Sequence, residues 1–372
     1  MIKVENTITK KTNAEEKDSF FLDNNLLIIN KKRTLPYISF AKIMASFGVI
    51  SLHLNNFWEF GNIKTEQWLI ENFYQTFFYY SVPIFVLCIG ATLVDFNERY
   101  GLFEYNKKRL IKVYIPLIGW TCILYLFKVY ILKNTGKIIF SFRNVWNYFF
   151  LSKINHIFKS LHIFILTYLL IPLVSFVEKN NKIRIYSYYF FVLLIVQGII
   201  PYLISLFGNK LVWIYNLNVG YLIYIFAGYI IHNHVFSKYS KIVIYLLGIS
   251  FFLVHLIGTK YLTLKYKHII LIHKGYNNLP PILYSCAMFL FIKEYSYLIF
   301  NIINKKYINK LGSLTLGPFF LHYAVKETLF EFKEFNKFIR INLIFYTFVI
   351  FSICIIISFI LKQIPLLKIL VP

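Results

Sequence analysis

Apolar segments long enough to cross a bilayer recur along almost the whole chain, separated by short polar or basic connections. A membrane-spanning helix needs about 20 predominantly apolar residues. The pattern predicts spans over residues 35–56, 73–95, 113–132, 161–177, 186–206, 212–231, 242–257, 280–299, 311–326 and 342–363. We therefore expect an all-α integral membrane protein with about ten transmembrane helices.

Composition supports this fold class. The 372 residues are 58% hydrophobic, with a mean hydropathy of +0.60, so no soluble domain of useful size is expected. The net charge of +24 is carried between the apolar spans, where basic residues anchor helix ends and attract anionic headgroups. We therefore predict a lipid bilayer, and no nucleic acid, as the partner of these charges. The four cysteines lie inside apolar runs without CxxC spacing, which suggests neither disulfides nor a zinc site.

Charge in the connections predicts how the chain is oriented. Residues 1–34 are polar and read as a flexible cytoplasmic tail. The first connection is acidic, with Glu59, Glu66 and Glu71, whereas the next, 97–111, is strongly basic. By the positive-inside rule the first span runs outward and 97–111 is cytoplasmic, which places both termini, including the short tail 364–372, in the cytoplasm. Connections 133–159 and 260–274 obey the rule less cleanly, since they also carry several lysines.

The first predicted span, 35–56, contains two ionisable residues, Lys42 and His53. They are eleven residues apart, which is three helical turns and about 16 Å along the axis, so they return to nearly the same face. Ser39, Ser46 and Gly48 lie on or near that face. Ionisable groups at membrane depth usually face an interior or a water-filled cavity. The alternative is a snorkelling lysine with a histidine at the opposite interface.

A second cluster is the basic run KKRLIKVYIP, residues 107–116. Arg109 and Lys112 are three apart and neighbours on a helix surface, and Lys108 belongs to the same run. Such a group can hold phosphates, through the arginine fork and the lysine point charge. A basic run beside a span is also an ordinary orientation signal.

Other histidines are weaker candidates. His162 and His322 lie in predicted spans and could position a substrate or simply pack. His232 and His234 have metal-like spacing, but we interpret them as a solvated turn and predict no metal site. The remaining histidines, His255 and His273 among them, receive no role. The acids avoid the span interiors, which disfavours an ion-coupled transporter and leaves histidine, suited to general-base work, as the candidate.

Six segments, in order, resemble the membrane acyltransferase-3 family over residues 35–363. Lys42-x10-His53 matches its Arg/Lys-x10-His signature, and Arg109-x-x-Lys112 resembles its Arg-x-x-Arg motif with lysine in the second place. SVPIFVLCIGATL, HIFILTYLLIPLV, YIFAGYII and LGSLTLGPFFLHY are similar to further family segments, although Tyr323 replaces the proline that follows the family's late histidine. The two lysines keep charge but lose the guanidinium fork.

The resemblance implies a stand-alone membrane acyltransferase domain over 35–363 in a bacterial cytoplasmic membrane. It implies transfer of an acyl group, most often acetyl, from cytoplasmic acyl-CoA to a hydroxyl of a surface glycan or lipid-linked sugar. On this interpretation Arg109, Lys112 and Lys108 hold the donor's phosphates, Lys42 stabilises negative charge, and His53 is general base or acyl relay. His162 and His322 position substrate. A polysaccharide exporter without covalent chemistry and a scaffold in a glycan-synthesis complex are the alternatives, and acetyl is not distinguished from succinyl.

Overall fold

The computed structural model describes residues 35–127, 129, 156–207, 221–330 and 342–371. The chain divides into a segment 1–36 and one compact unit, 37–372. The predicted tail, the connection 133–159 and the ends of the predicted spans 113–132 and 212–231 fall wholly or partly outside the described residues.

All regular secondary structure in the described ranges is helical. In the first half of the chain the elements are α2 (Pro36–Leu54), α3 (Asn56–Phe60), α4 (Glu66–Phe77), α5 (Ser81–Leu93), α6 (Leu102–Arg109), α7 (Ile115–Leu126) and α9 (His156–Ser175). In the second half they are α10 (Lys182–Leu193), α11 (Ile200–Leu206), α12 (Leu222–Asn233), α13 (Lys238–Tyr266), α14 (Leu279–Ile302), α15 (Lys305–Gly312), α16 (Leu316–Phe330) and α18 (Leu343–Gln363). Short 3-10 turns cover Phe78–Tyr80, Phe96–Glu98, Lys179–Asn181 and Leu367–Leu370, and π-helical turns cover Leu110–Tyr114 and Leu194–Ile199.

The prediction of an all-α integral membrane protein is confirmed. Within the described residues, seven helical stretches are long and apolar enough to cross a membrane: Pro36–Phe60, Glu66–Glu98, Leu102–Leu126, Lys179–Leu206, Lys238–Tyr266, Leu279–Ile302 and Leu343–Gln363. Two shorter apolar helices, Phe164–Ser175 and Leu222–Asn233, fall at the predicted fourth and sixth spans.

The predicted span 311–326 does not start as one helix: its first two residues end α15, and α16 begins only at Leu316. The Ser313 hydroxyl donates to the Lys310 carbonyl at 2.7 Å, and the Thr315 hydroxyl donates to the Gly312 carbonyl at 2.9 Å. Hydroxyls bonded in this way compete with the helical ladder, and Pro318 has no N–H to continue it. The break directs α16, with His322, toward the end of α2.

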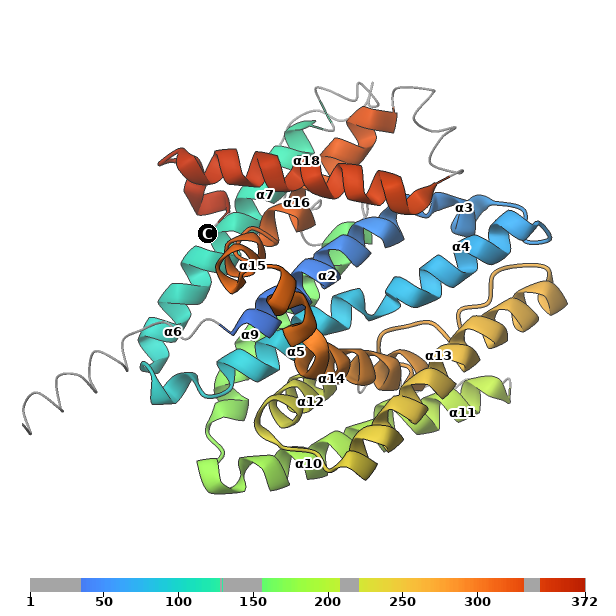
Figure 1. Ribbon diagram of the computed structural model, residues 1–372, viewed down its shortest axis with the longest axis horizontal. Helices are drawn as coiled ribbons and strands as arrows, with labels where there is room; N and C mark the ends of the chain where they lie inside the picture. The colour runs from blue at the N-terminus through green and yellow to red at the C-terminus, as the bar shows by residue number, and fades with distance from the viewer. Residues whose placement is uncertain (1–34, 128, 130–155, 208–220, 331–341, 372) are drawn as a thin grey trace, which may run out of the picture. The chain divides into compact units, whose positions relative to one another are not determined.

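The core of the compact unit is built around α5, which contacts α9, α12 and α14 (Figure 1). Gly90 of α5 lies against the backbone of Ile225, and Gly228 of α12 lies against the backbone of Leu87. Small residues that let two backbones approach closely are the usual contact between helices in a membrane. This contact holds α5 and its Cys88 in place beside α2.

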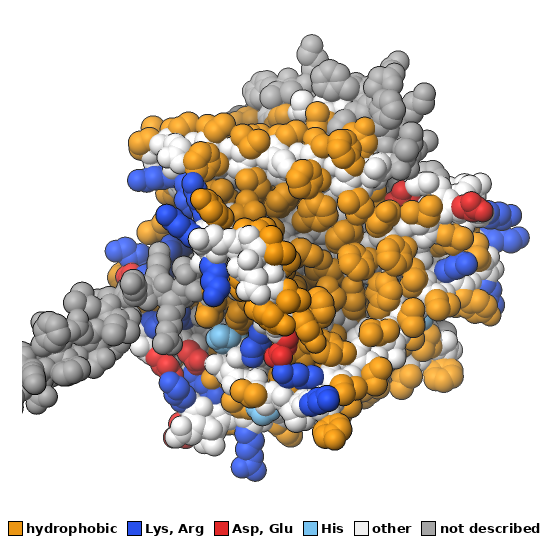
Figure 2. Space-filling model, viewed as in Figure 1, with side chains coloured by type: hydrophobic (Ala, Val, Ile, Leu, Met, Phe, Trp, Pro, Cys, Tyr) orange, Lys and Arg blue, Asp and Glu red, His pale blue; other side chains and the backbone are white. Residues whose placement is uncertain are grey.

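The surface of the helical unit agrees with a bilayer environment. Figure 2 shows a broad hydrophobic band across α18, α14 and α13, with Lys, Arg, Asp and Glu gathered toward both sides of it. In an apolar 18-residue stretch of α13, only 17% of the residues are buried. The same share is buried in the corresponding stretch of Lys179–Leu206. Apolar side chains left outside in this number mark lipid-facing helices.

Candidate functional site

Two histidines from distant parts of the sequence form a stacked pair at the C-terminal end of α2. The ring centroids of His53 (α2) and His322 (α16) lie 5.1 Å apart, with 28° between the ring planes. His322 is 1% exposed, whereas His53 is half-buried. Two imidazolium rings at this distance would repel each other, so the arrangement favours at least one neutral ring. A neutral imidazole is the form that can accept a proton.

The hydrogen bonding of His322 defines its tautomer. Its Nδ1 lies 2.9 Å from the carbonyl oxygen of Pro318, which can only accept, so Nδ1 carries the hydrogen. In a neutral ring, Nε2 is then a free lone pair, and it is buried with no partner among the described residues. His322 can therefore accept a hydrogen bond through Nε2 beside the His53 ring.

Lys326 completes this end of α2. Its Nζ donates to the carbonyl oxygen of His53 at 3.2 Å and lies 3.7 Å from a carboxylate oxygen of Glu327. Lys326 follows His322 by four residues, so one face of α16 presents both. The sequence alone did not assign Lys326 a role, although its four-residue spacing from His322 indicates that the two share a helix face.

Lys42 lies about three helical turns before His53, toward the N-terminal end of α2, and is near α5. Its side chain is within electrostatic range of the Cys88 thiol, and Cys88 is in turn within range of Tyr168 on α9. Tyr168 interacts with Arg109. Cys88 and Tyr168, to which the sequence alone assigned no role, therefore lie in the region between Lys42 and Arg109, and Tyr168 contacts Arg109 directly.

Arg109, the last residue of α6, is held between aromatic rings. Its guanidinium carbon lies 5.5 Å from the ring centroids of both Tyr105 and Tyr168, within the range of cation–π attraction. The Tyr105 hydroxyl donates to the Tyr168 carbonyl at 2.8 Å, which fixes one ring against α9. The Nε of Arg109 is buried and has no hydrogen-bond partner among the described residues. An oriented arginine with an unused donor is suited to an anionic ligand.

The other two basic candidates are placed differently. Lys108 lies 3.8 Å above the Tyr100 ring and 3.4 Å from Glu104, so its charge is already partly compensated. Lys112 is exposed on the π-helical turn Leu110–Tyr114. A π-helical turn alters the angular spacing of a helix and is frequent at functional sites. The structure thus directs Arg109 toward α9 and leaves Lys112 on the surface.

The remaining histidine candidates do not join these groups. His162 lies in α9, but its side chain is outside the described residues. The Nδ1 of His232 is 2.6 Å from the Tyr37 hydroxyl, whereas the His234 ring packs on Phe236. His232 is thus a packed residue rather than part of a solvated turn. The described residues contain no group of three metal-ligating side chains.

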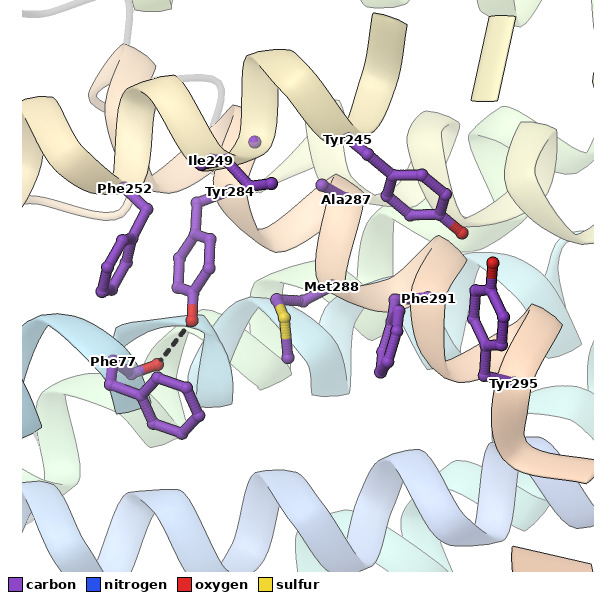
Figure 3. Close-up of a pocket in the computed structure, with 10 residues that line it drawn as sticks. Phe77, Tyr245, Ile249, Phe252, Tyr284, Ala287, Met288, Phe291 and Tyr295 are labelled. Atoms are coloured by element: carbon purple, nitrogen blue, oxygen red, sulfur yellow. Dashed lines mark hydrogen bonds between the residues drawn. The ribbon is translucent and has the colours of Figure 1, made fainter. Parts of the chain in front are cut away.

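An apolar groove of about 390 Å³ lies between α13, α14 and the end of α4 (Figure 3). Its lining includes Phe77, Phe252, Tyr284, Met288, Phe291 and Tyr295. The Tyr284 hydroxyl donates to the Phe77 carbonyl at 2.9 Å at one end, and the hydroxyls of Tyr245 and Tyr295 point toward each other at the other. Apart from these phenols the groove has no acid, base or nucleophile, so we do not locate the chemistry there.

The fold and these contacts define a polytopic helical membrane protein in which α2 carries Lys42 and His53, with His322 of α16 stacked on His53 and Arg109 at the end of α6. The acyltransferase-3 family model, described as an acyltransferase domain, matches residues 35–362. The chain belongs to this family and is a membrane acyltransferase, which takes an acyl group from a donor and passes it to an acceptor. No curated protein and no solved structure shows significant similarity to the chain.

Proposed function

We propose that this acyltransferase moves an acetyl group from acetyl-CoA to a sugar hydroxyl of a cell-surface or exported polysaccharide, or of its lipid-linked precursor. The protein would work in a bacterial cytoplasmic membrane with both termini in the cytoplasm. The donor would bind at the Arg109 side and the acceptor at the His53 side. The observation that supports this proposal is the contact of His53, on the α2 span that also carries Lys42, with the His322 ring of α16.

In the donor half, Arg109 supplies the oriented fork for a phosphate, with Lys112 and Lys108 adding positive charge at the surface. Lys42 is about 16 Å from His53 along the helix, too far for both to touch one carbonyl group. We therefore assign Lys42 to the donor's phosphates or pantetheine arm. The extended arm of the donor then carries the thioester toward the histidines.

In the acceptor half, His53 takes the proton of the acceptor hydroxyl as its oxygen attacks the thioester carbonyl carbon. The carbon–sulfur bond breaks, the new ester forms, and the CoA thiolate receives the proton from His53. His322, neutral and tied to the Pro318 carbonyl, packs on the His53 ring and holds it in position. A positioned general base of this kind contributes roughly 10²–10⁴-fold in rate.

The proposal is tested with membranes that contain either the wild-type protein or His53→Ala at matched expression. Labelled acetyl-CoA is supplied, and label is followed into extracted polysaccharide, with succinyl-CoA as a parallel donor. We expect acetyl label in the wild type and none in His53→Ala. Equal label in both would remove His53 from the chemistry, and label from succinyl-CoA alone would change the acyl group.

A further inference from the structure

A buried lysine without an acidic partner lies at the same end of the bundle as His53. Lys274, in the connection 267–278 between α13 and α14, is 4% exposed, and its Nζ has no hydrogen-bond partner among the described residues. The ion pairs in the described part of the chain do not include it. Desolvation lowers the pKa of Lys274 well below its usual range. An anion bound beside Lys274 would favour its protonated, ammonium form at this depth.

The connection holds this lysine in a defined position. The Gly275 N–H donates to the Tyr79 hydroxyl at 3.0 Å, and Gly275 adopts a φ of +113°, which favours glycine. The Asn278 amide donates to the carbonyl of Ile272 at 2.8 Å and to that of Lys274. His273 lies 2.7 Å from the Tyr202 hydroxyl through Nδ1. These hydrogen bonds fix the backbone on both sides of Lys274, so the position of the lysine is defined by its connection.

The Trp58 ring packs against the end of the Lys274 side chain. The Nζ of Lys274 lies 3.3 Å from the centroid of the Trp58 ring, and Trp58 follows His53 by five residues. The indole N–H donates to Asn72 at 3.0 Å, and the Trp58 carbonyl accepts from Trp68 at 3.0 Å, which fixes the ring. The indole face attracts the ammonium group but leaves its N–H donors unused.

One stripe of α13 adds further unused polar atoms. His255, Thr259 and Thr263 follow a four-residue spacing and are fully buried, although the helix is otherwise largely exposed. Both ring nitrogens of His255 and the Thr259 hydroxyl lack partners among the described residues. His255 is within electrostatic range of Lys274, and its ring meets Tyr79 edge to face at 5.1 Å. Buried polar atoms are normally hydrogen-bonded, so such a set is suited to binding a polar ligand.

We propose that Lys274 and His255, above the Trp58 face, bind an anionic group, a carboxylate or a phosphate, carried by the sugar acceptor. This proposal rests on the acyl-transfer function above and names its acceptor as acidic. The cluster lies at the His53 end of α2, whereas the Arg109 group lies on the Lys42 side, so the two anion sites serve different substrates. Aromatic faces with a few convergent polar groups are the usual lining of a small-molecule site.

The test measures thermal stabilisation of the purified full-length protein by inorganic phosphate, by glucuronate and by glucose, at constant ionic strength. A ligand that binds only the folded state raises the melting temperature. Lys274→Met removes the charge, Lys274→Gln keeps a neutral polar group, and Lys260→Met changes an exposed lysine of α13 as a matched control. Acetyl-CoA is measured in parallel as a separate ligand for every variant.

We expect phosphate and glucuronate, but not glucose, to stabilise the wild type and Lys260→Met. The concentration for half-maximal stabilisation should rise at least tenfold in Lys274→Met and Lys274→Gln, while the acetyl-CoA shift is retained. Unchanged anion binding in both Lys274 variants, or no anion effect in the wild type, would overturn the acceptor site. Loss of the acetyl-CoA shift in these variants would assign the site to the donor. No acetyl-CoA shift in any protein would instead count against the proposed function.

Discussion

The contact between α5 and α12 gives the most direct test of the packing that positions the site. A Cβ added at Gly90 would clash first with the Ile225 carbonyl oxygen, with the Ile225 Cα at 2.8 Å, and one added at Gly228 would clash first with the Leu87 carbonyl oxygen, with its carbonyl carbon at 2.8 Å. Carbon atoms prefer about 3.5–4.0 Å, so either alanine must push the helices apart by about 1 Å or more. The neighbouring atoms are backbone and cannot rotate away.

The expected cost follows from two opposing effects. Overpacking of a close-packed interior costs about 1–3 kcal/mol, and alanine regains about 0.5–1 kcal/mol of helix propensity over glycine. Gly90→Ala and Gly228→Ala should therefore each destabilise by about 1–2 kcal/mol. Gly198→Ala is the matched control, because its nearest neighbours would be side-chain methyls at 3.5 Å, an ordinary contact. That variant should be neutral or slightly stabilising.

The double variant sharpens the test. Because Gly90 and Gly228 separate the same pair of helices, the shift forced by one alanine makes room for the other. Gly90→Ala with Gly228→Ala should then cost less than the sum of the single changes. The assay is thermal unfolding of purified protein followed by a thiol-reactive dye, since Cys88, Cys286 and Cys354 are buried in the folded state. Equal stability of Gly90→Ala and Gly198→Ala would show that α5 and α12 are not in close backbone contact.

Three further outcomes are expected. His322→Gln should lower kcat by about tenfold or more, yet less than the roughly 10²–10⁴-fold loss of a general base, and should shift the pH–rate profile; an unchanged profile would leave His322 a packing residue. Arg109→Ala should weaken CoA binding, measured by equilibrium dialysis, more than Lys108→Ala does, because Lys108 is already paired with Glu104; the reverse order would contradict this assignment. Burial lowers the pKa of Lys274 below its value in the unfolded chain, which is about 10.4. At a pH between the folded and the unfolded pKa, the unfolded state binds more protons, so the stability of the wild type rises with pH in that range. Lys274→Met should lose that rise in thermal melts, and parallel curves would argue against a buried, unpaired lysine.

Much of the fold was predictable because lipid imposes a simple rule. Backbone groups in a bilayer must be satisfied within the helix, so apolar length alone marks the spans. The positions of α2, α13, α14 and α18 follow directly from it. The break before α16 did not, because it depends on hydroxyl-to-carbonyl bonds at Ser313 and Thr315 that apolar length does not register.

The candidate site was predictable only in part. Helical spacing placed Lys42 and His53 on one face, but it could not show that this face meets α5 at Lys42 and α16 at His53. The pairing of His53 with His322 joins residues 269 positions apart and depends on how the helices cross.

Local sequence was misleading at His255. A lone helical histidine is usually a packed residue, and the neighbours that make His255 a candidate come from other elements, namely Trp58 and Lys274. A lysine in a connection is likewise expected to be solvated, whereas Lys274 is buried against the Trp58 ring, and its loop is bonded to Tyr79. Such burial is a tertiary property that composition and spacing do not report.

The role of His53 as general base is tested most directly by the saturation curve of acetyl transfer against acetyl-CoA concentration, measured for the purified wild-type protein and for His53→Gln. If His53 is the general base at the acceptor end, His53→Gln should lower kcat by about 10²–10⁴-fold and leave the KM for acetyl-CoA close to that of the wild type. A wild-type kcat in His53→Gln, with the protein shown to be folded, would contradict the account.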